Sequence, residues 1–230
     1  MSLWSRIPPG GLLVDASLWS ANLAALGEEV SRAAPLVDLF HLDVGDGRFV
    51  PSLLFFPDLL AALRPLTQMP LHAHLMVDDP VPIAEAFAAA GADLVSVHVE
   101  TGDHAAAAVK AITAHGTAAG LALRVDTDPA AVLPYLDDID AVIMVGTPLG
   151  TKGTTASAET YRRITRTLGL LTQHAPHRDI RILADGGIRP ETVPRLAAAG
   201  AHGVVAGSVL FGADDLATAA RWLHTGGRAR

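Results

Sequence analysis

The sequence contains no cysteine, few aromatic residues and no long apolar run. Without cysteine there is no disulfide framework and no thiolate chemistry, a composition that suits a cytoplasmic protein. No stretch reaches the roughly 18 consecutive apolar residues of a membrane-spanning helix, and the first residues lack the apolar centre of a secretory signal. We therefore expect a cytoplasmic protein that does not act on a membrane.

Positive charge is also scarce. Lys and Arg together number 17 against 24 Asp and Glu, which gives a net charge of −7, and no basic run is present. Nucleic-acid binding usually requires a concentrated basic surface, so we do not expect a nucleic-acid partner. A small anionic ligand is still possible, because the local charge of a binding site can differ from the net charge of the protein.

Alanine, leucine and valine dominate the chain, and 50% of its 230 residues are hydrophobic. Short apolar runs alternate with Ala-rich helical stretches. The expected strands are 12–17, 39–44, 71–77, 94–100, 120–125, 141–146, 180–185 and 203–207. Eight strands, each followed by a helix, predict an α/β fold, the (β/α)8 TIM barrel, as a single domain over 1–230 with its core at about 12–225. A doubly wound sheet is the rival, but no G-x-G-x-x-G follows the first strand.

Polar residues fall at the carboxyl ends of these strands, where barrel enzymes carry their chemistry. His41 and Asp43 are two residues apart and so share one face of a strand. His74 lies on the third strand and Asp185 ends the seventh. A lone strand histidine is usually structural, and Asp before Gly-Gly is often a turn residue.

Together these four residues would form a polar cluster that an apolar core disfavours. Two imidazoles and two carboxylates suit one divalent metal ion, Zn, Fe, Mn or Co. His98 and Glu100 end the fourth strand, and we expect them to support the ligands or to be structural.

Glycines follow the seventh and eighth strands, as Gly186 and Gly187 in "DGGI" and as Gly207 before Ser208 in "VAGS". Barrels often build a phosphate site at these two loops, since glycine lets backbone N–H groups approach an anion closely. A tight connection with no ligand is the simpler reading of either motif. As a pair on consecutive strands, the two glycine motifs indicate a site that binds a phosphate group.

These segments resemble the ribulose-phosphate 3-epimerase family over roughly residues 12 to 215. "DASLWSANLAALGEEV" resembles its opening segment, and "HLDVGDGRFVPSLLF" resembles its His-x-Asp-x-Met-Asp-Gly-x-Phe-Val-Pro-Asn signature. "HAHLMV", "GADLVSVHVE" and "ADGGIRPETVPRLAAAGAHGVVAGSVLFG" resemble later blocks.

The resemblance implies a metal-dependent barrel enzyme that inverts C3 of a ketose phosphate, with D-ribulose 5-phosphate and D-xylulose 5-phosphate as the default pair. It implies His41, Asp43, His74 and Asp185 as metal ligands. Asp43 and Asp185 also match the acid and base that exchange a proton through an enediolate. Substrate contacts are implied for Ser17, His74, Met76, Met144, Gly186, Gly187, Gly207 and Ser208. We also expect a homo-oligomer.

The chain departs from the family pattern at two places. Gly45 stands where the family usually has Met, which would leave extra volume in the site. After the sixth strand, "MVGTPLGTKG" lacks the Gly-x-Gly-Gly of a loop that closes over the phosphate. Gly150 and Lys152 are the candidate phosphate or lid residues here. Lys152 is either a point charge on the phosphate or a solvent-facing lysine.

These departures leave the substrate open, and an epimerase for another ketose phosphate such as allulose 6-phosphate is the near alternative. A phosphosugar decarboxylase of the same barrel type is a further alternative, although its Asp-x-Lys-x-x-Asp arrangement is absent. A non-catalytic sugar-phosphate-binding barrel is the third.

Overall fold

The computed structural model describes residues 2–8, 10–150 and 154–227. Eight parallel strands form a closed barrel in which neighbours follow chain order and β8 pairs with β1. The (β/α)8 barrel expected from the sequence is confirmed. Its strands are β1 (Leu13–Ser17), β2 (Leu39–Gly45), β3 (Leu71–Met76), β4 (Leu94–His98), β5 (Ala118–Leu123), β6 (Ala141–Val145), β7 (Arg181–Asp185) and β8 (Gly203–Ala206).

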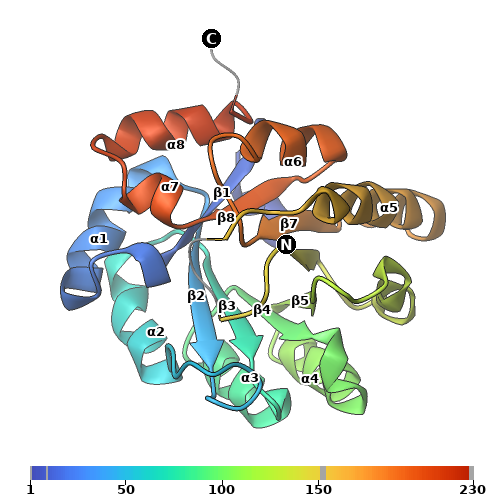
Figure 1. The fold of residues 1–230 in the computed structure, drawn as a ribbon. Helices are drawn as coiled ribbons and strands as arrows, with labels where there is room; N and C mark the ends of the chain where they lie inside the picture. The colour runs from blue at the N-terminus through green and yellow to red at the C-terminus, as the bar shows by residue number, and fades with distance from the viewer. Residues whose placement is uncertain (1, 9, 151–153, 228–230) are drawn as a thin grey trace.

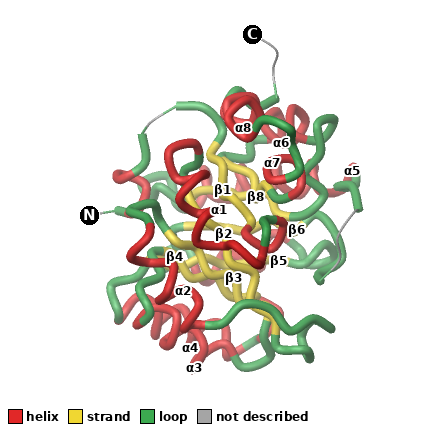
Figure 2. Tube along the Cα trace, turned by 90° about the vertical axis from the view of Figure 1, so that its left-hand side faces the viewer, coloured by secondary structure: helices red, strands yellow, loops and turns green. Residues whose placement is uncertain are grey.

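Helices surround this ring of strands, as Figure 1 shows down the barrel and Figure 2 shows from the side. The α-helices are α1 (Leu26–Ala33), α2 (Pro57–Leu63), α3 (Pro80–Ala89), α4 (Asp103–Ala114), α5 (Ala158–His174), α6 (Val193–Ala199), α7 (Ser208–Phe211) and α8 (Leu216–His224). Short 3-10 helices cover Leu3–Arg6, Leu18–Ser20, Leu23–Ala25, Ala34–Leu36, Arg64–Leu66, Val99–Thr101 and Pro129–Tyr135. Within the described residues no helix has both the length and the apolar character needed to cross a membrane.

The connection after β5 differs from the expected strand–helix alternation, because the 3-10 helix Pro129–Tyr135 replaces an α-helix there. Proline has no N–H to donate, and its ring clashes with the carbonyl one helical turn before it. Pro134 inside the segment is therefore incompatible with a regular α-helix.

Strand residues alternate between the barrel interior and the helix layer, and each side forms its own apolar cluster. Ile143 and Val145 face the interior with Leu39 and Leu94, and the 3-10 helix Leu3–Arg6 closes its amino-terminal end. The Trp4 indole N–H donates to the Asp140 carbonyl at 2.9 Å. Apolar packing thus fills the amino-terminal end of the barrel interior, and the buried polar side chains lie between this packing and the carboxyl ends of the strands.

Candidate active site

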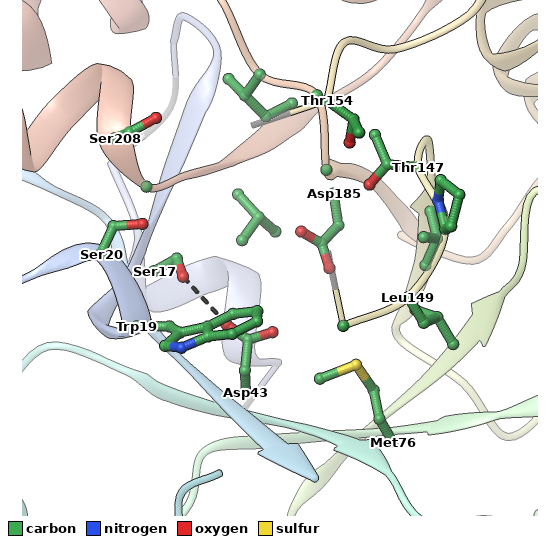
Figure 3. A pocket seen from close by; sticks show the side chains of 18 of the residues that line it. Ser17, Trp19, Ser20, Asp43, Met76, Thr147, Leu149, Thr154, Asp185 and Ser208 are labelled. Carbon is green, nitrogen blue, oxygen red and sulfur yellow. Dashed lines mark hydrogen bonds between the residues drawn. The ribbon is translucent and has the colours of Figure 1, made fainter. Parts of the chain in front are cut away.

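A cavity of about 320 Å³ opens at the carboxyl ends of the strands (Figure 3). That size is in the range of small-molecule sites. His41 and His74 are fully buried on strands β2 and β3. The residues expected at the site that line this cavity are Ser17, Asp43, Met76, Gly150, Asp185, Gly186, Gly187, Gly207 and Ser208.

The four expected metal ligands converge. His41, Asp43, His74 and Asp185 each offer one ligand atom, and these atoms lie within 4.8 Å of one another. The β2–β3 register sets Asp43 beside His74. His41 Nε2 lies 3.3 Å from Asp43 Oδ1, and His74 Nδ1 lies 3.3 Å from Asp185 Oδ2.

The tautomer of His74 follows from the residues behind it. Burial raises the pKa of Glu100, but hydrogen bonds from His98 and Thr127 lower it to about 2, so Glu100 is ionised. His98 Nδ1, 2.9 Å from Glu100, must donate to that carboxylate. His98 Nε2 then accepts from His74 Nε2 at 2.9 Å. The lone pair of His74 is left on Nδ1, facing Asp43 and Asp185, and His98 and Glu100 form a hydrogen-bonded chain behind the His74 ring.

His74 Nδ1 is also a buried atom for which no hydrogen bond is formed by the described residues, although Asp185 is near. His41 differs, because both of its ring nitrogens have partners: Nδ1 lies 3.1 Å from the Asp15 carboxylate and therefore donates to it. His41 Nε2 faces Asp43 Oδ1 at 3.3 Å, so either a proton on Nε2 or a metal ion must lie between these two atoms. Two imidazole nitrogens and two carboxylates point at one place, an arrangement that requires a positive charge.

A divalent ion fits this donor set of two imidazoles and two carboxylates, which suits Zn, Fe, Mn or Co. Without a metal ion, protons on the histidines supply the positive charge that this arrangement requires. Burial lowers the pKa of His41, but the facing Asp43 and Asp15 carboxylates raise it well above its usual value. Burial raises the pKa of Asp43, yet His41 and His74 hold it far below the usual range.

The Asp43 and Asp185 side chains enter the cavity from opposite sides and point toward one another in Figure 3. Asp43 comes from β2 and Asp185 from the end of β7. Ser17 Oγ donates to Asp43 Oδ2 at 3.1 Å and so fixes that carboxylate. A flat substrate between them would meet one carboxyl group on each face.

The backbone of Gly186, Gly187 and Gly207 forms another part of the cavity lining, called the glycine wall below. Ser208, which follows Gly207, lies across the cavity from Met76 in Figure 3. Gly186 and Gly187 have φ of 82° and 72°, which favours glycine. A Cβ on Gly187 would lie 2.2 Å from the Ala156 nitrogen, and one on Gly207 would lie 2.5 Å from Ser20 Oγ. A side chain at Gly187 would therefore displace the Ala156 backbone, whereas one at Gly207 would require Ser20 to move. Both glycines present their main chain to the cavity.

Sequence reasoning missed Arg189, which carries the only positive charge among the described residues that line the cavity. Its Nη1 donates to Ser208 Oγ at 2.8 Å, so the guanidinium lies at the glycine wall. The signal was present, since Arg189 stands two residues after Gly187 in "DGGIR". Trp19, in the quoted "DASLWS" segment, also lines the cavity and was missed. Lys152 lies outside the described residues.

The family model described as the Ribulose-phosphate 3 epimerase family matches residues 13–211. The chain belongs to the ribulose-phosphate 3-epimerase family. It is 35% identical to the Bacillus subtilis ribulose-phosphate 3-epimerase, an alignment that covers 88% of this chain and 93% of that one. It is 35% identical to the chloroplastic ribulose-5-phosphate-3-epimerase of Arabidopsis thaliana, over 97% of this chain and 80% of that one. These relatives make it an epimerase, an enzyme of the carbohydrate isomerase class.

Among solved structures, KGPDC from Streptococcus mutans has a TM-score of 0.70, at 18% identity. The match covers 94% of this chain and 97% of that one. At this identity the likeness concerns the barrel fold alone.

Membership of the ribulose-phosphate 3-epimerase family led to the expectation that Met144 contacts substrate, and the structure contradicts it. Val145 lines the cavity, so the preceding residue on β6 points to the helix layer. The Met144 sulfur accepts from Thr167 Oγ1 on α5 at 3.6 Å. Met144 is fully buried there, outside the barrel.

The extra volume expected at Gly45, where ribulose-phosphate 3-epimerases usually carry Met, is also absent. A Cβ at Gly45 would lie 2.4 Å from the Ser52 carbonyl oxygen and 2.9 Å from Val50 Cγ2. The segment after β2 folds back on the strand, and the Leu54 N–H donates to the Gly45 carbonyl at 3.2 Å. The loop backbone thus occupies the space that a side chain would take.

Proposed function

We propose that this chain is a metal-dependent ribulose-phosphate 3-epimerase that interconverts D-ribulose 5-phosphate and D-xylulose 5-phosphate. The observation that carries the proposal is the convergence of His41, Asp43, His74 and Asp185 at one cavity. Similarity to enzymes named for this reaction supports the choice of substrate.

Epimerisation at C3 requires removal of a weakly acidic proton next to a ketone and its return on the other face. A divalent ion bound by these ligands would stabilise the negative charge of the enediolate. Asp43, which is ionised, takes the proton on one face, and Asp185 supplies a proton on the other. In the reverse direction the two residues exchange roles. Ser17 holds Asp43 in place through its hydrogen bond.

Apolar side chains protect this chemistry from water. Met76 is 2% exposed and reaches the cavity beside Asp43 in Figure 3. Val145 and Ile188 add further apolar lining. Excluding water strengthens each electrostatic contact at the reacting carbon and limits loss of the enediolate to side reactions.

Phosphate binding is assigned to the glycine wall, and here Arg189 is expected to matter most. Arg189→Ala should raise KM for the phosphorylated substrate about 10- to 100-fold, the loss typical of a hydrogen bond to a charged group. The effect on kcat should be much smaller, since the Arg189 guanidinium is held by Ser208 at the glycine wall. Steady-state kinetics measure both values.

Two further variants serve as controls for Arg189→Ala. Arg189→Lys keeps the charge without the planar fork and should fall between wild type and alanine. Arg221→Ala, on the outer helix α8 where it contacts Thr218, should change nothing. An unchanged KM in Arg189→Ala would place the phosphate elsewhere.

Substrate choice is tested by assaying the metal-loaded protein with ribulose 5-phosphate and allulose 6-phosphate in parallel. The proposal predicts kcat/KM for ribulose 5-phosphate within the usual enzyme range of about 10⁴–10⁸ M⁻¹s⁻¹. Faster turnover of allulose 6-phosphate would show that the substrate has changed, and would indicate that the altered sequence of residues 146–153 reflects this change. Binding of both without turnover of either would indicate a sugar-phosphate-binding barrel.

A further inference from the structure

A chain of four polar side chains is buried in the barrel interior, outside the set that lines the cavity. Asp15, His41, His72 and Ser96 come from β1 to β4 and are each 0% exposed. Asp15 Oδ2 lies 3.1 Å from His41 Nδ1 and 2.6 Å from His72 Nδ1. His72 Nε2 lies 2.8 Å from Ser96 Oγ. Apart from His41, the proposed mechanism uses none of these groups.

The distances determine where the protons are. Asp15 Oδ2 lies within hydrogen-bond distance of two imidazole nitrogens, and a carboxylate oxygen that both rings share can satisfy both only by accepting. Both Nδ1 atoms must therefore donate to Asp15 Oδ2. The 3.1 Å between the two Nδ1 atoms is then a contact of two donors rather than a hydrogen bond. His72 Nε2 is left to accept the Ser96 hydroxyl.

We propose that Asp15 is a positioning residue for His41, which it holds as the Nδ1–H tautomer with the Nε2 lone pair directed at Asp43 and the metal ligands. A carboxylate behind an imidazole ligand fixes the ring and strengthens it as a donor. His72 and Ser96 hold Asp15 in turn. This inference rests on the proposed metal site.

The two histidine ligands are thereby presented through different nitrogens. His41 donates through Nδ1 to Asp15 and offers Nε2. His74 donates through Nε2 to His98 and offers Nδ1. This asymmetry gives the inference a signature that a merely structural carboxylate would not produce.

A second ion held by Asp15, His41 and His72 is the competing reading, since their ligand atoms also cluster within 4.8 Å. The two imidazole-to-carboxylate separations, 3.1 Å from His41 and 2.6 Å from His72, are hydrogen-bond distances. Ligands around a tetrahedral ion with bonds of about 2.0–2.2 Å lie more than about 3.2 Å apart. The geometry therefore favours shared protons, and metal stoichiometry decides between the two.

The first test compares Zn²⁺ dissociation constants by competition with a chromophoric chelator. Wild type should bind one equivalent, and Asp15→Asn should bind about 10- to 100-fold more weakly, the usual effect of losing a partner behind a metal ligand. Ser96→Ala leaves the Asp15–His41 contact intact, so its Zn²⁺ affinity should fall much less than that of Asp15→Asn. Asp140→Asn, a carboxylate that accepts from the Ala119 N–H, is the matched control and should bind as wild type does.

The outcomes distinguish failure of the proposed metal site from failure of the proposed role of Asp15. A wild-type protein that binds no Zn²⁺ would refute the proposed metal site itself. Wild-type affinity in a folded Asp15→Asn protein, or two equivalents in wild type, would overturn only the role of Asp15.

A second measurement needs no variant and so does not depend on the folding of Asp15→Asn. Nitrogen-15 spectra of the histidine rings in Zn²⁺-loaded wild type should show zinc on Nε2 of His41 and on Nδ1 of His74. Each opposite nitrogen should carry a proton. Zinc on His41 Nδ1 would overturn the inference.

Discussion

Asp185→Asn and Asp43→Asn are each expected to abolish C3 inversion, with kcat/KM reduced by at least the ~10²–10⁴-fold typical of a positioned general acid or base. The physical reason is that inversion needs one carboxyl group on each face of the enediolate, and a carboxamide cannot carry the proton. A coupled assay of xylulose 5-phosphate formation measures the loss. Because each residue is also a ligand, Zn²⁺ content must be measured for every variant.

Asp140→Asn, at the amino-terminal end of the barrel, controls for the change of Asp to Asn and should keep wild-type activity. One of the two active-site variants is expected to retain exchange of the C3 proton with solvent from a single face. Epimerisation near the wild-type rate by either variant, with metal bound, would refute the acid–base assignment.

Removing the metal is expected to have the second large effect. A Lewis acid contributes several kcal/mol to stabilising a developing oxyanion, which corresponds to a loss of about 10³-fold or more in kcat. Addition of one equivalent of Zn²⁺, Co²⁺, Mn²⁺ or Fe²⁺ should restore activity. Full activity of a protein shown by elemental analysis to be free of metal would contradict this account.

Metal uptake should also depend on pH. The Asp43 and Asp15 carboxylates raise the pKa of His41 well above its usual value in the metal-free protein. His41 is then protonated at neutral pH, and the metal must displace that proton. The apparent affinity should therefore rise with pH until the raised pKa of His41 is passed. Chelator titrations at several pH values measure the slope, and the affinity should not depend on pH if no proton is displaced.

The barrel and the clustering of His41, Asp43, His74 and Asp185 could be predicted from sequence, because polar residues at the carboxyl ends of barrel strands converge on one mouth. Strand runs bounded by Gly, Pro and helical stretches fix the eight strands to within a few residues, and the spacing of His41 and Asp43 fixes their common face. The orientation of Met144 could not be predicted in this way. In "AVIMVG" both faces of β6 are buried and apolar, so the run carries no alternation that shows which side chains point inward.

The packing at Gly45 and the contacts of Asp15 could not be predicted from sequence, because both depend on residues far apart in the chain. The space at Gly45 is filled by the Ser52 backbone, and that return of the chain depends on the whole segment after β2. Asp15 and His72 carried a usable signal, because each is a polar residue inside an apolar strand. Such a residue needs a buried partner. That His41 and His72 share Oδ2 of Asp15 depends on the register of β1, β2 and β3.

Deuterium incorporation from solvent tests the two-carboxylate account most directly. Metal-loaded protein is incubated with ribulose 5-phosphate in D₂O, and the product and residual substrate are analysed by NMR. With Asp43 and Asp185 on opposite faces, one carboxylate keeps the substrate proton while the other delivers deuterium. We predict xylulose 5-phosphate that carries deuterium at C3 from the first turnovers, with little label in the residual substrate. Product that retains the original C3 proton, or no product at all, would contradict the account.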